Sequence, residues 1–220
     1  MKTKIKICGI TNIEDALYAI DCGADAIGLV FYAKSPRYIS LAHAKVIIQQ
    51  LPPFVSVFGL CVNADPNFVK QVIRTGVNIL QFHGDESPSF CQQFGFPYVK
   101  AVRVEKKDDI ENAANEYNES RALLLDSKSK HVYGGSGQMF DWSIIPQDLA
   151  KKVIVAGGLT PLNVTNLLEK VSPMGVDVSS GVELQKAVKS KQKIKDFCHA
   201  VRKFNCRLTG AHPSNCVNFS

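Results

Sequence analysis

The sequence lacks the patterns that mark membrane-spanning and disulfide-stabilised proteins. No run of about 18 apolar residues occurs in the 220-residue chain, so we expect no transmembrane segment. The first apolar segment begins within a few residues of the N-terminus, without a signal-peptide pattern. The seven cysteines are odd in number, widely spaced and without a C-x-x-C pair, which argues against a disulfide framework or a zinc site. These absences predict a cytoplasmic protein.

Histidine is scarce, and the excess of positive charge is moderate. None of the five histidines belongs to an H-E-x-x-H pattern, so we expect no catalytic metal. The net charge of +6 is concentrated between Lys186 and Arg207, where Asp196 is the only acidic residue. Nucleic-acid binding is one interpretation of that segment. A solvated helix face that also attracts an anionic substrate is the favoured one.

Apolar segments alternate with helix-like segments along nearly the whole chain. The apolar runs start roughly 20 to 30 residues apart, which is typical of repeated βα units. The predicted strands are residues 5–8, 26–31, 55–62, 79–82, 98–104, 122–125, 153–156 and 176–179. The predicted helices are residues 12–22, 41–51, 66–75, 88–94, 109–117, 161–171 and 191–204. Strands this apolar are covered on both faces, which favours an α/β fold of one domain, a (β/α)8 TIM barrel. An open doubly wound sheet is the alternative.

Two stretches depart from this repeat. Residues 127–138 are polar and glycine-rich, and residues 142–149 resemble a helix interrupted by Pro146. We therefore expect an irregular sixth βα connection that begins with a long active-site loop. Residues 205–220 lack periodicity, so we assign residues 1–204 to the barrel and 205–220 to a flexible C-terminal tail.

The first predicted strand carries a candidate base. Side chains alternate along a strand, so Lys6 and Cys8 share one face, and in a barrel Cys8 would lie at the inner mouth. A neighbouring cation favours thiolate over thiol, which lowers the pKa of a cysteine below its free value of about 8.5. We expect Cys8 to act as a general base. The alternative is a small buried thiol.

Other polar residues follow strands elsewhere, at the end of the barrel where enzymes of this fold place their working groups. Asp126 closes an apolar strand, and partial burial favours the protonated form of a carboxyl group that a general acid needs; capping of the next loop is the alternative. Arg37 has the fork geometry that binds a carboxylate, with an ordinary surface position as the alternative. His83 is expected to donate or accept hydrogen bonds in the pocket wall, and Asp177 lies in the eighth strand.

Turns rich in glycine and serine follow the seventh and eighth predicted strands. In barrels these turns commonly bind phosphate through backbone N–H groups. They contain Gly157 with Gly158, and Ser179 with Ser180. Gly135 and Gly137 belong to a further loop that would close over the same group. Because turns need glycine in any case, the shared location of these loops is what predicts a phosphate site.

Six segments together form a recognisable combination. They are KICGIT at 6–11, QFHG at 81–84, LD at 125–126, GGSG at 134–137 with FDW at 140–142, AGGL at 156–159 and GVDVSSGVE at 175–183. This combination resembles the phosphoribosylanthranilate isomerase family of tryptophan biosynthesis, from about residue 4 to residue 204. Two positions depart from the family pattern: Phe82, where leucine is commoner, and Ser136, where threonine is.

The resemblance implies an Amadori rearrangement of N-(5'-phosphoribosyl)anthranilate to 1-(2-carboxyphenylamino)-1-deoxyribulose 5-phosphate. It implies that Cys8 removes the ribose C2 proton and that Asp126 protonates the ring oxygen. Arg37 would hold the anthranilate carboxylate, Asp177 would contact the substrate near its amine, and the turns after the seventh and eighth strands would bind phosphate.

Chemistry of this kind needs an acid and a base but no cofactor. We therefore expect a small phosphorylated molecule as the binding partner, no nucleic acid and no membrane, and a monomer or a homodimer. The alternatives are another phosphosugar barrel, such as the histidine-pathway isomerase or a metal-dependent epimerase, and a non-catalytic barrel that binds a phosphorylated ligand.

Overall fold

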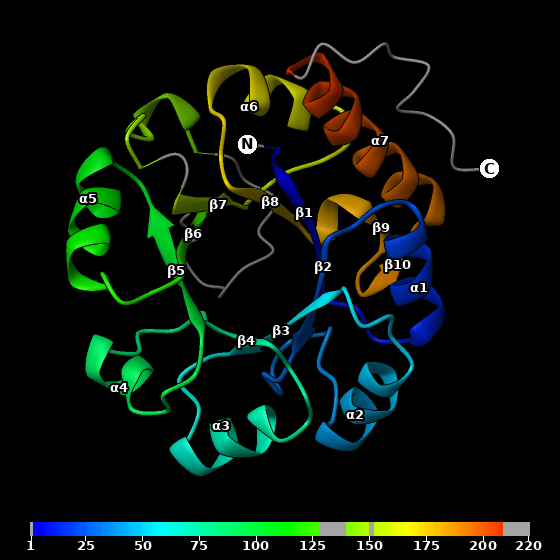
Figure 1. Cartoon of the computed structure of the whole chain (residues 1–220), viewed down its shortest axis with the longest axis vertical. Coiled ribbons are helices and arrows are strands. Elements are labelled where there is room, and N and C mark those ends of the chain that lie inside the picture. The colour runs from blue at the N-terminus through cyan, green and yellow to red at the C-terminus, as the bar shows by residue number, and fades with distance from the viewer. Residues whose placement is uncertain (1, 128–139, 150–151, 209–220) are drawn as a thin grey trace.

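Eight parallel strands close into a barrel, and helices cover its outer surface (Figure 1). This computed structural model describes residues 2–127, 140–149 and 152–208. The strands are β1 (Lys4–Cys8), β2 (Ala26–Val30), β3 (Ser56–Cys61), β4 (Ile79–Phe82), β5 (Tyr98–Val104), β6 (Ala122–Ser127), β7 (Val153–Val155) and β8 (Gly175–Val178). Strand β8 pairs with both β7 and β1, so the predicted (β/α)8 barrel is confirmed and the open sheet is wrong.

The helices follow the strands, and each begins within three residues of its predicted start. They are α1 (Ile13–Asp21), α2 (Leu41–Gln49), α3 (Pro66–Ile73), α4 (Pro88–Gln92), α5 (Lys107–Glu116), α6 (Val164–Lys170) and α7 (Lys191–Leu208). Asn12 caps α1, because its side chain accepts a hydrogen bond from the backbone N–H of Asp15. Proline occupies the first turn of α3 and of α4, where no N–H is needed. No helix in the described ranges has both the length and the apolar character needed to cross a membrane.

The two faces of each strand contribute to separate layers. Ile5 and Ile7 of β1 are buried in the apolar layer between the barrel and its helices. Lys6 and Cys8 lie on the opposite face and point into the barrel, as the alternation predicts. The interior of the barrel is filled mainly by small and apolar side chains. The Lys6 ammonium lies there, 5.1 Å from the ring centre of Phe58.

The structure differs from the prediction after β8. A short 3-10 turn, η3 (Ser180–Val182), leads into a hairpin of β9 (Glu183–Gln185) and β10 (Val188–Lys189). The sequence pattern does not predict this hairpin, because its strands are very short and its turn uses Ala187, at φ 67°, in place of the usual glycine or asparagine.

Helix α7 also extends beyond the predicted boundary at residue 204 and ends at Leu208. It continues because the side chain of Asn205 is buried and exchanges two hydrogen bonds, each 2.9 Å, with the backbone of Thr3. Residues 209–220 of the predicted tail lie outside the described residues. Among the described cysteines, Cys206 is disulfide-bonded, whereas Cys8, Cys22, Cys61, Cys91 and Cys198 are free thiols.

The sixth connection is described only in part. After β6, the chain is described again from residue 140, where η1 (Trp142–Ile144) forms a single 3-10 turn and Trp142 is buried. This agrees with the short or distorted helix predicted at 142–149. The predicted glycine-rich loop, with Gly135 and Gly137, lies outside the described residues.

Candidate active site

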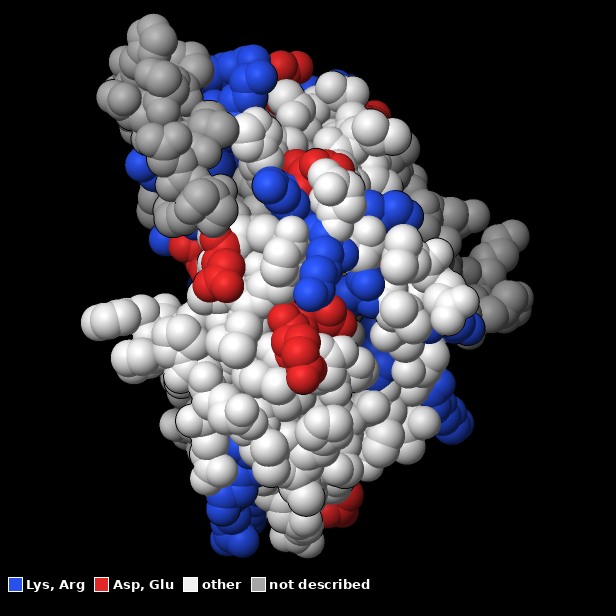
Figure 2. All heavy atoms as spheres, turned by 90° about the vertical axis from the view of Figure 1, so that its right-hand side faces the viewer, with Lys and Arg blue, Asp and Glu red and all other residues white. Residues whose placement is uncertain are grey.

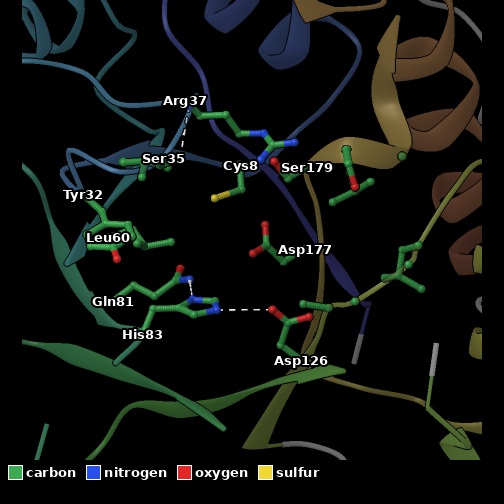
Figure 3. Close-up of a pocket in the computed structure, with 18 of the residues that line it drawn as sticks. Cys8, Tyr32, Ser35, Arg37, Leu60, Gln81, His83, Asp126, Asp177 and Ser179 are labelled. Carbon is green, nitrogen blue, oxygen red and sulfur yellow. Dashed lines mark hydrogen bonds and ion pairs between the residues drawn. The ribbon is translucent and has the colours of Figure 1, made fainter. Parts of the chain in front are cut away.

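A cleft opens at the carboxyl-terminal mouth of the barrel, and most of the predicted site residues line it (Figure 3). Strand ends meet at this mouth because every strand of a parallel barrel runs in the same direction. Cys8 comes from β1 and Asp126 from β6, two strands that are not neighbours in the barrel. The remaining predicted residues that line the cleft are Arg37, His83, Gly157, Gly158, Asp177, Ser179 and Ser180.

Cys8 is a buried thiol, and the predicted lowering of its pKa is wrong. Burial is the largest cause and raises the pKa of Cys8 above its ordinary value; Lys6 and Lys189 lower it, and Asp177 raises it. Lys6 is less effective than expected, because its Nζ lies 2.8 Å from Asp177 Oδ2 in a buried ion pair. The carboxylate therefore offsets much of the cation's field at the sulfur.

Asp126 lies at the end of a chain of side chains that also includes His83 and Gln81 (Figure 3). The Nε2 atom of His83 is 3.2 Å from Asp126 Oδ2, and its Nδ1 atom is 2.9 Å from the amide nitrogen of Gln81. With the Gln81 amide as donor, Nδ1 accepts, so the histidine proton resides on Nε2 and is donated to Asp126. The other oxygen of Asp126 accepts the backbone N–H of Ser127 at 2.9 Å.

Asp177 keeps one oxygen available to the cleft. Its Oδ2 atom is bound by Lys6, whereas its Oδ1 atom is buried and has no hydrogen-bond partner among the described residues. A buried carboxylate oxygen without a donor is costly. A substrate N–H or O–H group in the cleft would satisfy it.

Arg37 is held by a buried carboxylate rather than exposed on a loop. Its Nε and Nη2 atoms lie 2.7 and 2.8 Å from the two oxygens of Glu183. Lys189 forms an ion pair with the same carboxylate, with its Nζ 3.0 Å from Glu183 Oε1. The surface position considered for Arg37 is therefore wrong.

The two predicted phosphate turns line the cleft, and their residues are half-buried. Gly157 and Gly158 have φ angles of 79° and 65°, which residues other than glycine rarely adopt. A Cβ atom on Gly157 would lie 2.6 Å from the backbone nitrogen of Ser127. On the other turn, a Cβ atom on Gly181 would overlap the carbonyl oxygen of Leu159, so the turns after β7 and β8 pack directly on each other.

Known proteins match this chain over most of its length. A model of the family described as N-(5'-phosphoribosyl)anthranilate (PRA) isomerase matches residues 5–200. A relative with that name from Pseudomonas fluorescens SBW25 is 52% identical over 198 residues, which cover 90% of this chain and 94% of the relative. The chain belongs to the N-(5'-phosphoribosyl)anthranilate isomerase family.

Solved structures of PRA isomerases have the same fold. One, in complex with reduced 1-(o-carboxyphenylamino)-1-deoxyribulose 5-phosphate, is 40% identical with a TM-score of 0.80 and covers 90% of this chain and 98% of its own. Another, of monomers generated from the dimeric enzyme of Thermotoga maritima, is 39% identical, with the same TM-score and coverage. The predicted isomerisation of N-(5'-phosphoribosyl)anthranilate in tryptophan biosynthesis is confirmed, and the alternative phosphosugar and non-catalytic barrels are not supported.

The sequence-based prediction does not single out Gln81, Glu183 or Lys189, nor Tyr32, which also lines the cleft. Gln81 carries a usable signal, because it lies two residues before His83 and therefore shares the inward face of β4. Glu183 is the last residue of the GVDVSSGVE segment, but its spacing does not show that it faces Arg37. Lys189 carries no signal, because its burial depends on a hairpin that the pattern does not predict.

Proposed function

We propose that this PRA isomerase works by general acid–base catalysis, with Asp126 as the acid and Cys8 as the base. The observation that carries this proposal is that both side chains, from the separate strands β1 and β6, line one cleft. Both are buried, so each would act in a site from which most water is excluded.

The proposed steps make four proton transfers, and the substrate undergoes no net oxidation or reduction. Asp126 donates its proton to the ring oxygen, the C1–O bond breaks, and the nitrogen lone pair forms a C=N bond. The Cys8 thiolate then removes the C2 proton, so that the C2–H electrons form C1=C2 and the C=N electrons return to nitrogen. Protonation of the resulting enolamine at C1 and loss of its C2 hydroxyl proton give the ketone.

Neighbouring groups support the charges that these steps create. The N–H groups of His83 and Ser127 both donate to Asp126 and would stabilise the carboxylate left by proton transfer. Lys6 and Lys189 favour the thiolate of Cys8, although burial and Asp177 keep the neutral thiol predominant.

Substrate binding divides among three parts of the cleft. Arg37 would bind the anthranilate carboxylate, Oδ1 of Asp177 would accept the amine N–H, and the turns at 157–158 and 179–180 would bind the phosphate. The ligand in the solved relative has a carboxylate and a phosphate, and the binding partner proposed here is likewise a small phosphorylated molecule.

We propose a homodimer rather than a monomer, formed at the opposite end of the barrel. Phe54 is 97% exposed there and borders a hollow lined by Phe58, Ile79, Ile154 and Met174. An aromatic side chain left in water beside an apolar hollow favours an isologous contact, in which each Phe54 enters the partner's hollow. The Thermotoga maritima relative is itself described as dimeric.

The surface charges and the cysteines support two further parts of the proposal: the protein has no nucleic-acid partner, and it is cytoplasmic. Figure 2 shows the side of the molecule that carries α1 and α7, where acidic and basic side chains lie next to one another. A nucleic-acid surface needs a continuous basic field, so this pattern favours a solvated face. Five of the described cysteines are free thiols, which favours a reducing compartment, and the disulfide at Cys206 is the exception.

Replacement of the two proposed catalytic residues tests the mechanism. Because the substrate is fluorescent, its disappearance reports turnover directly. Cys8→Ala and Asp126→Asn are each expected to lower kcat by at least about 100-fold, since general acid–base groups contribute about 10²- to 10⁴-fold. Binding of a reduced product analogue should change little. Cys61→Ala is the matched control, because Cys61 is a buried thiol that faces the helices. Retention of most of the kcat in Cys8→Ala would disprove the assigned base.

A further inference from the structure

We propose that Glu183 is a positioning residue that orients the guanidinium of Arg37 toward the substrate carboxylate. The inference rests on the proposed function, in which Arg37 binds that carboxylate. It concerns a residue of the β9–β10 hairpin that does not itself line the cleft.

The contact between Glu183 and Arg37 is a two-point fork. Glu183 takes the side of the guanidinium formed by Nε and Nη2, at 2.7 and 2.8 Å. An arginine side chain has five N–H groups, so both on Nη1 and the second on Nη2 are left for another carboxylate. Figure 3 shows this guanidinium above Cys8 and beside Ser179.

Glu183 itself has no capacity left for a ligand. Besides Arg37, it accepts from Lys189 Nζ at 3.0 Å and from the backbone N–H of Ala187 at 3.2 Å. These four donors match the roughly four acceptor sites of a carboxylate. Burial raises the pKa of Glu183, but the bonds from Arg37 and Lys189 outweigh burial and hold it below the ordinary value, so the group stays ionised.

The cluster formed by Arg37, Glu183 and Lys189 has one positive charge in excess. Lys189 cannot supply that charge to a ligand as readily as Arg37, because its Nζ also donates to the carbonyl oxygen of Ser179 at 3.0 Å. The surplus therefore lies at the free side of Arg37, where an anionic group would be neutralised at a largely buried position.

The stem of Arg37 is fixed separately from its head. A Cβ atom on Gly9 would overlap Arg37 Cδ, so the aliphatic part of the side chain lies against the backbone that follows Cys8. The remaining freedom is the direction of the guanidinium, and Glu183 sets it. The strained turn residue Ala187 donates to the same carboxylate, which ties the hairpin conformation to this contact.

The test compares the natural substrate with an analogue made from aniline, which lacks the carboxylate. Four variants are measured on both: Arg37→Gln, Glu183→Gln, their combination, and Gln185→Ala as an exposed control on the same strand. Glu183→Gln is expected to raise the KM of the natural substrate by about tenfold or more, since the guanidinium of Arg37 loses one of the two carboxylate oxygens that set its direction. Its kcat/KM for the aniline analogue should stay within about twofold, and the double variant should resemble Arg37→Gln alone.

Glu183→Asp distinguishes orientation from charge and protects against a folding failure of the glutamine variant. It keeps the charge but withdraws the oxygens by one methylene, so orientation predicts a raised KM and charge balance alone predicts none. Equal losses on both substrates, or additive losses in the double variant, would overturn the inference. If Arg37→Gln keeps the preference for the carboxylated substrate, the proposed carboxylate site fails as well; if only Glu183→Gln keeps it, the positioning role alone fails.

Discussion

Lys6 and Asp177 form a nearly fully buried ion pair, with Nζ 2.8 Å from Oδ2, on the barrel strands next to Cys8. The pair explains why a lysine two residues before a cysteine does not make that cysteine a ready thiolate. The Asp177 charge raises the pKa of Cys8, and burial, the largest cause, raises it further. In the free enzyme the proposed base is therefore mostly protonated near neutral pH.

The raised pKa of Cys8 predicts that its reactivity toward alkylating reagents increases with pH. Only the thiolate reacts with iodoacetamide, so alkylation should accelerate with pH up to and beyond the free-thiol pKa of about 8.5. Peptide-level mass spectrometry distinguishes Cys8 from the other thiols. In Asp177→Asn the whole profile should move to lower pH, because an anion that raises the pKa is gone and the Lys6 cation is no longer paired. A wild-type profile that levels off below pH 8 would contradict this picture.

The same ion pair predicts a large stability difference between two lysines of one strand. Lys6→Met leaves Asp177 buried without its partner, which should cost about 3–5 kcal/mol of unfolding free energy. Lys4→Met is the matched control, because Lys4 pairs with Asp25 at 2.7 Å but its side chain is 64% exposed. That loss should stay below about 1 kcal/mol. Urea unfolding measures both, and similar losses would mean that the Lys6 pair is not desolvated as the structure shows.

The sequence was sufficient for features whose cause is local. Strand alternation places Lys6 and Cys8 inside the barrel, and the helices begin within three residues of their predicted starts. Strand ends of a closed barrel must meet, so residues as distant as Cys8 and Asp126 could be predicted to share a cleft.

Features that depend on how charges pair across the fold could not be predicted. The pKa of Cys8 depends on Asp177, which is 169 residues away in the chain and forms an ion pair with Lys6. The setting of Arg37 depends on Glu183, whose position comes from a hairpin without a glycine turn. Neither relation leaves a mark on residue spacing.

The homodimer proposal predicts that one exposed side chain controls assembly. Phe54→Asp places a charge beside the apolar hollow and should convert the homodimer to a monomer. Burial of an unpaired charge at the centre of the interface would be too costly. Sedimentation velocity at several protein concentrations measures the change. Leu162→Asp is the control, since Leu162 is 91% exposed but does not line the hollow. A wild-type protein that sediments as a monomer at every concentration would disprove the proposal.

Gly157→Ala should impair catalysis as well as stability, because its added methyl group is directed at Asp126, the proposed acid. At φ 79° the new Cβ would lie 2.6 Å from the nitrogen of Ser127 and 2.8 Å from Asp126 Oδ1. The strain alone costs about 1–3 kcal/mol, and displacement of Asp126 should lower kcat by about tenfold or more. Gly95→Ala provides the matched control, because Gly95 also has a positive φ, 55°, but nothing lies within 4 Å of its added carbon. Its free energy of unfolding, measured in urea, should fall by a similar amount, and its kcat should be unchanged. If Gly157→Ala also keeps its kcat, the turn after β7 does not hold Asp126 in place, and the role of Gly157 is confined to the backbone turn itself.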